Sequence, residues 1–88
     1  MKKSDDLYLE LVTPEHILFS GDIGLVDLPG KAGRFTMLRD HGNIISTLAK
    51  GSIRIVGKDN VERIFECSGG VVECVDNKVT VLISNHPE

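Results

Sequence analysis

Residues 71–83 read VVECVDNKVTVLI, and this stretch decides the fold class. In its second half every other residue is apolar, from Val79 to Ile83. Such a period of two is typical of a strand with one buried side. Asp76 and Asn77 interrupt the stretch, and both residue types favour tight turns. The stretch therefore predicts two strands separated by a turn.

The same period extends outward in both directions. Leu7, Leu9 and Leu11 share one side of a strand, with residues 8, 10 and 12 on the other side, and the apolar residues of 52–55 alternate in the same way. The apolar residues of 44–50 fit the period of a strand as well as that of a helix, and we expect a strand there. Further runs rich in β-branched and aromatic residues cover residues 17–28, 34–38 and 61–67. Turns containing glycine, proline or asparagine separate these runs, so we expect seven or more short strands in an antiparallel sandwich or barrel.

Two glycines, Gly21 and Gly24, lie inside the strand-like run of residues 17–28. Glycine within a strand marks a bulge or a bend. A bent strand can pass from one sheet to the other. We therefore expect the chain to change layers in this run.

Length and composition allow one domain over residues 1–88, with frayed ends at residues 1–6 and 84–88. The chain is 41% hydrophobic and 26% charged, which is typical of a folded domain and not of a disordered one. Its net charge of −3 and scattered basic residues argue against a nucleic-acid partner. No apolar run approaches the roughly 20 residues of a membrane helix, so we expect no membrane insertion and a cytoplasmic location.

The candidate chemistry is sparse. Cys67 and Cys74 lack the spacing of a zinc site, and both lie in apolar runs, so we expect buried, reduced thiols. His41 follows Asp40, which makes an acid–base pair conceivable, but no nucleophile accompanies it. No phosphate-binding loop or serine elbow is present. We therefore expect no catalytic residue, no metal, no nucleotide site and no cofactor.

Several strands are apolar on both faces, for example at Val71, Val72 and Val75. One face fills the core of a sandwich, and the other must be covered. In so small a domain the cover is expected to be a protein partner.

Longer motifs support a resemblance to a known family. Residues 28–38 read LPGKAGRFTML and are followed after two residues by His41, which resembles the "PGxxGxFxxLxxH" stretch of the epsilon subunit of F-type ATP synthases. Residues 48–55, 67–73 and 77–82 match the same family in order and spacing, and so do residues 9–15 with 19–21. Two departures flank the histidine: Arg39-Asp40 replaces the usual Pro-Gly or Pro-Asn, and Gly42-Asn43 replaces Ala-Pro.

The resemblance implies a β-sandwich of about ten strands that belongs to the rotor of the synthase. It implies two partners, the gamma subunit and the membrane-embedded c-ring, and a location at the cytoplasmic face of the membrane in the F1 sector. The family commonly continues into two C-terminal helices that carry ATP sensing and inhibition. Here five polar residues follow Ile83, so we expect a coupling subunit without these helices.

The resemblance also implies the contact residues. The c-ring-facing segment corresponds to Gly30, Lys31, Ala32, Gly33 and Arg34, with Asp40, Gly42 and Asn43 alongside. His41 and Ser46 correspond to positions that face gamma.

Two alternatives remain open at this point. A free β-sandwich module could bind a peptide or a sugar through its uncovered face. A small hydrolase could use His41 and Asp40. Association with a membrane ATPase, no such association, and turnover abolished by His41→Ala are the observations that separate the three functions.

Overall fold

The chain folds into eight strands in the computed structural model, which describes residues 6–84. The bounds of the strands are β1 (Leu7–Val12), β2 (Ile17–Gly30), β3 (Gly33–Met37), β4 (Ile44–Leu48), β5 (Gly51–Gly57), β6 (Glu62–Cys67), β7 (Gly69–Val75) and β8 (Lys78–Ser84). The all-β prediction is confirmed, with eight strands in place of about ten. Within this described part no helix has the length and apolar character that crossing a membrane requires.

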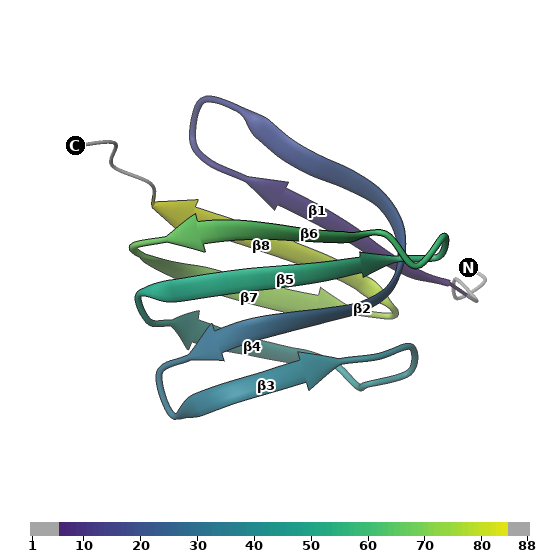
Figure 1. The fold of residues 1–88 in the computed structure, drawn as a ribbon. Helices are drawn as coiled ribbons and strands as arrows, with labels where there is room; N and C mark the ends of the chain where they lie inside the picture. Colours follow the sequence, from purple (N-terminus) through teal and green to yellow (C-terminus); the bar gives the residue numbers. More distant parts are fainter. Residues whose placement is uncertain (1–5, 85–88) are drawn as a thin grey trace.

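The strands form two packed layers (Figure 1). The front layer of Figure 1 contains β3, β2, β5 and β6, and the back layer contains β4, β7, β8 and β1. Neighbouring strands run antiparallel, as expected, with one exception: β1 pairs with β8 in parallel. The first and last strands therefore lie side by side and fasten the two ends of the domain together.

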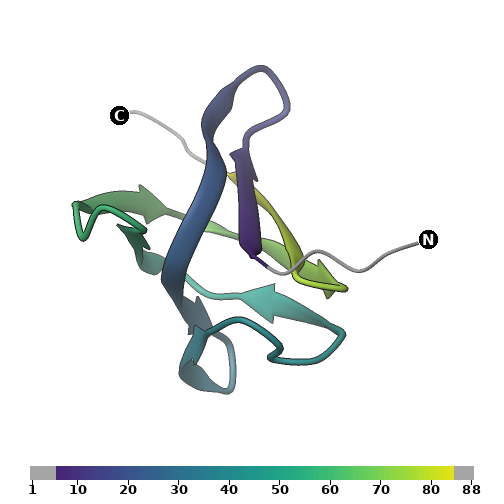
Figure 2. The same cartoon turned by 90° about the vertical axis from the view of Figure 1, so that its right-hand side faces the viewer.

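Strand β2 belongs to both layers. Its first half pairs with β1 from Ile17 to Ile23, and its second half pairs with β5 and β3. The register shifts between Ile23 and Leu25, so Gly24 occupies a bulge as the sequence predicts. Figure 2 shows β2 running from the β1–β2 hairpin at the top to the β3 hairpin at the bottom. This single strand pairs with strands of both layers, where two shorter strands could stand. That accounts for part of the difference from ten strands.

The core lies between the layers and is built from the alternating residues that the sequence indicates. Leu7, Leu9 and Leu11 are buried, while their neighbours on β1 are half-buried on the outer side. The other strands contribute Ile23, Val26, Leu28, Met37, Leu48, Ile53, Ile55, Val72, Val79, Val81 and Ile83. A close-packed interior of aliphatic side chains makes the two layers one rigid body.

Both cysteines belong to this core. Cys67 and Cys74 are free and buried, which confirms the expectation from their apolar surroundings. The Cys67 thiol donates to the carbonyl of Ala49, with Sγ and O 3.6 Å apart. Burial raises the pKa of the Cys74 thiol, and the nearby Asp76 carboxylate adds to this effect.

The expected frayed ends fall mostly outside the described residues, at 1–5 and 85–88. The two described members are held in place. Ser84 is the last residue of β8, and its carbonyl accepts from the Ser68 amide at 2.9 Å. The carboxylate of Asp6 pairs with the Lys58 ammonium at 2.6 Å.

The layered core predicts different costs for two leucines. Leu9 is fully buried, whereas Leu82 on the outer side of β8 is 46% exposed. Leu9→Ala should lower the free energy of unfolding by about 2 to 5 kcal/mol, and Leu82→Ala by less than about 1 kcal/mol. Urea unfolding followed by circular dichroism measures both. Equal losses in the two variants would contradict the layer assignment.

Burial of the thiols predicts slow labelling. Because its pKa is raised, the Cys74 thiol stays protonated at neutral pH, and only the thiolate reacts. A thiol reagent added to the native protein at pH 7 should label Cys67 and Cys74 slowly, and both at once after unfolding in urea. Rapid stoichiometric labelling of either thiol without denaturant would show that the core is open.

Candidate functional site

The β2–β3 hairpin presents the first expected contact segment. Gly30 pairs with Gly33 across the two-residue turn Lys31-Ala32, and the Lys31 amide donates to the Thr47 carbonyl at 3.1 Å. A Cβ at Gly30 would lie 2.7 Å from the Gly33 carbonyl oxygen, so no side chain fits there. Gly33 has φ 135, which favours glycine. The turn is therefore fixed, and it exposes the cationic side chains of Lys31 and Arg34.

The second expected segment lies at the other end of the sandwich. Strand β3 leads away from the turn, and the loop of residues 38–43 begins after Met37 (Figure 1). Five extended residues span about 13 Å between their first and last Cα atoms. The structure therefore does not bring Asp40, Gly42 and Asn43 alongside the Gly30–Arg34 turn. We call the end with residues 31–32 the turn end and the end with residues 38–43 the loop end.

The two residues expected to face gamma occupy different settings. His41 is exposed in the loop, and its Nδ1 lies 3.5 Å from the Gly42 carbonyl oxygen. Ser46 is half-buried on β4 and pairs with the core residue Val72, so it points toward the interior. Its neighbour Ile45 points outward and is 73% exposed. Ile45 and Thr47 are thus the exposed outer residues of β4, and Ile45 is the aliphatic one.

The outer side of the back layer, which we call the back face, is rich in exposed aliphatic side chains. Ile45 lies on β4 opposite Glu73 of β7, whereas Val71 on β7 is directly opposite Leu82 on β8. The row continues from Leu82 to Val12 on β1 and from Val12 to Ile17 on β2. Ile17 is 66% exposed. An apolar row across four strands is unusual for a surface that faces water.

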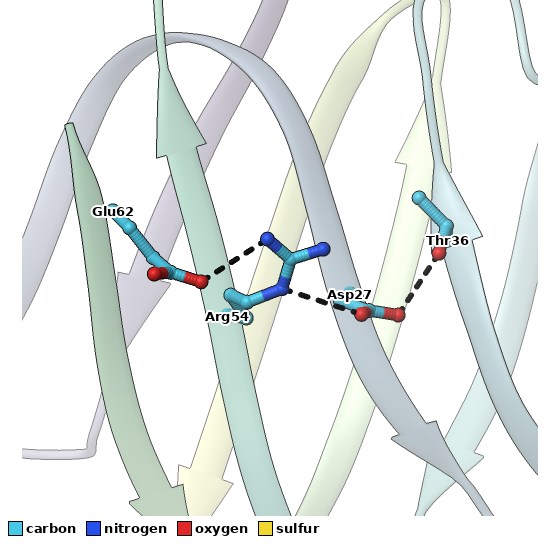
Figure 3. Close-up of polar contacts among 4 residues, drawn as sticks. All are labelled: Asp27, Thr36, Arg54 and Glu62. Atoms are coloured by element: carbon cyan, nitrogen blue, oxygen red, sulfur yellow. Dashed lines mark hydrogen bonds and ion pairs between the residues drawn. The ribbon is translucent and has the colours of Figure 1, made fainter. Parts of the chain in front are cut away.

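The outer side of the front layer, the front face, is polar by comparison (Figure 3). Arg54 on β5 lies between two carboxylates, with Nη1 3.1 Å from Glu62 Oε2 and Nε 3.5 Å from Asp27 Oδ2. The Thr36 hydroxyl donates to Asp27 Oδ1 at 2.9 Å. These side chains satisfy one another across four strands. Ile64 on the edge strand β6 is the large aliphatic residue that this face exposes, at 59%.

The loop end also carries a cluster of charges. Asp6, Arg39 and Lys58 line a small open cleft beside Gly24, at the bulge of β2. The hydrogen bond and the charge of Lys58 lower the pKa of Asp6. This carboxylate therefore stays ionised in the native state down to a lower pH than usual, and any stability it contributes is lost as the pH falls through that lowered pKa.

The acid–base alternative finds a different arrangement at Asp40. Its carboxylate Oδ1 accepts from Asn77 Nδ2 at 3.0 Å, and its amide donates to Asn77 Oδ1 at 2.7 Å. Asp40 is thus engaged with the turn between β7 and β8. Among residues 6–84 no three His, Cys, Asp or Glu side chains gather as a metal ion would require.

The sequence reasoning missed two kinds of residue. Ile17, Ile45 and Leu82 form much of the back face, and Asn77 is a buried polar residue with 4% exposure. Alternation could have found the first kind, because Leu82 shares a side with Lys78 and Thr80 in the sequence pattern. No local signal could have found the second kind, because the partner of Asn77 lies far away in the chain.

Comparison with known proteins identifies relatives. Residues 6–86 match the family model described as the ATP synthase delta/epsilon chain, β-sandwich domain. The ATP synthase epsilon chain of Chlorobaculum tepidum is 36% identical over 83 residues, covering 93% of this chain and 94% of the relative. That of Nitratidesulfovibrio vulgaris is 42% identical over 82 residues, covering 93% of this chain but 59% of the relative. The chain thus spans about three fifths of some relatives and nearly all of others.

Solved structures share the fold. A chain of the Euglena gracilis mitochondrial ATP synthase, from a complex of OSCP, F1 and c-ring, superposes with a TM-score of 0.87 over 97% of this chain and 54% of that chain. A chain of the Tetrahymena thermophila central stalk and c-ring superposes with a TM-score of 0.80 over 96% of this chain and 67% of that chain. The sequence identities are 15% and 18%, so these two comparisons show a shared fold and do not show a shared function.

Proposed function

Because the chain belongs to the family of ATP synthase delta/epsilon chain β-sandwich domains, we propose that it is a rotor subunit of the central stalk of an F-type ATP synthase. In this role it links the gamma subunit to the c-ring and couples ion flow to ATP synthesis. It catalyses no reaction itself. Its location is the F1 sector at the cytoplasmic face of the membrane. The observation that carries the proposal is the difference between the two outer faces.

Gamma is proposed to cover the back face. Ile45, Val71 and Leu82 are 73%, 43% and 46% exposed there, and burying such side chains contributes on the order of 1 kcal/mol each. The front face offers less to a partner, because its charged groups already pair with one another. His41 belongs to the same contact, because the loop of residues 38–43 leads directly into β4.

The c-ring is proposed to meet the turn end. Lys31 and Arg34 stand on a turn that cannot carry a side chain at Gly30 and is bonded to β4. A rigid turn with two cations suits polar or acidic loops, since complementary charges fix the register of a contact. Because the two ends lie apart, we assign the expected contact residues to two partners. Gly30 to Arg34 face the c-ring, and residues 40–43 face gamma.

Transmission of torque requires a stiff body between these two contacts. Two close-packed sheets resist deformation because their side chains interdigitate. β2 strengthens the body further, since its backbone is bonded into both layers. A contact made at the turn end is therefore mechanically continuous with the back face.

The two outer faces predict opposite results for two isoleucines. Ile45→Ser on the back face should weaken binding to the gamma subunit about tenfold, because an exposed aliphatic side chain is lost from the contact. Ile64→Ser on the front face is the matched control and should stay within about twofold of the wild type. Calorimetric titration with purified gamma measures both. Loss of affinity in Ile64→Ser alone would place gamma on the front face and contradict the proposal.

The turn end predicts a coupling defect without a folding defect. Arg34→Glu reverses an exposed charge, so its free energy of unfolding should change by less than about 0.5 kcal/mol. ATP-driven ion pumping in membranes that contain the assembled complex should fall. Glu66→Lys, an exposed charge reversal on the front face, serves as the control and should pump normally. Unchanged pumping by Arg34→Glu would remove the turn from the c-ring contact.

A further inference from the structure

The loop of residues 38–43 is bonded to the turn between β7 and β8 by three hydrogen bonds. Two of them join Asp40 and Asn77 reciprocally: the Asp40 amide donates to Asn77 Oδ1 at 2.7 Å, and Asn77 Nδ2 donates to Asp40 Oδ1 at 3.0 Å. In the third, the Asp76 amide donates to Asn43 Oδ1 at 2.9 Å. We call this set the loop–turn contact.

Asn77 is the centre of the contact. It is 4% exposed, and its carbonyl also accepts from the Tyr8 amide at 2.8 Å. It therefore joins three segments that are far apart in the sequence: the start of β1, the loop and the β7–β8 turn. A buried amide with its partners in place fixes geometry strongly, because each unmade bond would leave a polar group without water.

Within its own sequence the loop has one backbone hydrogen bond: the His41 amide donates to the Leu38 carbonyl at 3.1 Å and closes a turn. Residues 38–43 contain no proline, and they include Gly42 with φ 104. Asp40 has φ 64, a left-handed conformation that aspartate tolerates better than most non-glycine residues, and it lies inside this turn. The two bonds to Asn77 hold this turn against the β7–β8 turn at the residue next to His41.

We propose that Asn77 is a positioning residue that sets the conformation in which the loop presents His41 to the gamma subunit. This inference rests on the proposed function, because it takes the loop as part of the gamma contact. Asn77 itself is buried and acts through Asp40. A loop held in its bound shape loses less conformational entropy on association than a free one, so the contact raises affinity without touching the partner.

Exchange of donor and acceptor across the contact tests this inference. Asn77→Asp replaces the Nδ2 donor by an oxygen that faces the Asp40 carboxylate across 3.0 Å, which is repulsive. The double variant Asp40→Asn with Asn77→Asp restores one donor and one acceptor. Both residue types tolerate the left-handed angles at these positions. Asn60→Asp is the control, because Asn60 has φ 66 in an exposed turn at the same end.

Two readouts are needed, both on the full chain. Hydrogen exchange of the Asp40 amide, followed by NMR, reports the loop in the isolated protein. Titration with purified gamma reports binding. Asn77→Asp should speed exchange about tenfold and weaken affinity about fivefold, and the double variant should return both to within about twofold of the wild type. Asn60→Asp should change neither.

The outcomes separate this inference from the function on which it rests. Unchanged Asp40 exchange in Asn77→Asp, or no rescue in the double variant, would overturn the positioning role. Altered and rescued exchange with constant gamma affinity would also overturn it, because the order that Asn77 gives the loop would then have no effect on gamma binding. If the wild type fails to bind gamma at all, the proposed function fails, while the exchange data still show what orders the loop.

Discussion

The structure depends on one strand that is bonded into both layers. β2 pairs with β1 in its first half and with β3 and β5 in its second half, and the bulge at Gly24 lets the strand change layers without a break. The two sheets therefore cannot slide past each other as separate bodies, which is the property a torque-bearing element needs.

The asymmetry of the outer faces follows from this arrangement. The front face contains the second half of β2. There the carboxylate of Asp27 bonds to the Thr36 hydroxyl and pairs with the Arg54 guanidinium, so these polar groups have partners within the face. The back face also carries the charged residues Glu10, Glu73 and Lys78 on its outer side, but within residues 6–84 they form no row of ion pairs like that of the front face. The aliphatic residues between them are exposed. Surfaces of the first kind suit water, and surfaces of the second kind suit a partner. Under the proposed function, that partner is the gamma subunit.

The sequence was most informative where the signal is local. Alternation predicted which side of β1, β5 and β8 is buried, and the glycines predicted the bulge of β2, because both depend on neighbouring residues. The parallel pairing of β1 with β8 was not predictable, since long-range register leaves no mark in one sequence. For the same reason the turn end and the loop end could not be separated, and Asn77 looked like an ordinary turn residue.

Hydroxyl-radical footprinting of the rotor tests the central claim most directly. It measures oxidation of exposed side chains in the isolated chain and again in the assembled central stalk. The account predicts that Ile17 and Leu82 on the back face lose most of their oxidation on assembly, while Ile64 on the front face, 59% exposed, keeps it. Protection of Ile64 with continued oxidation of Leu82 would contradict it, because gamma would then cover the polar face.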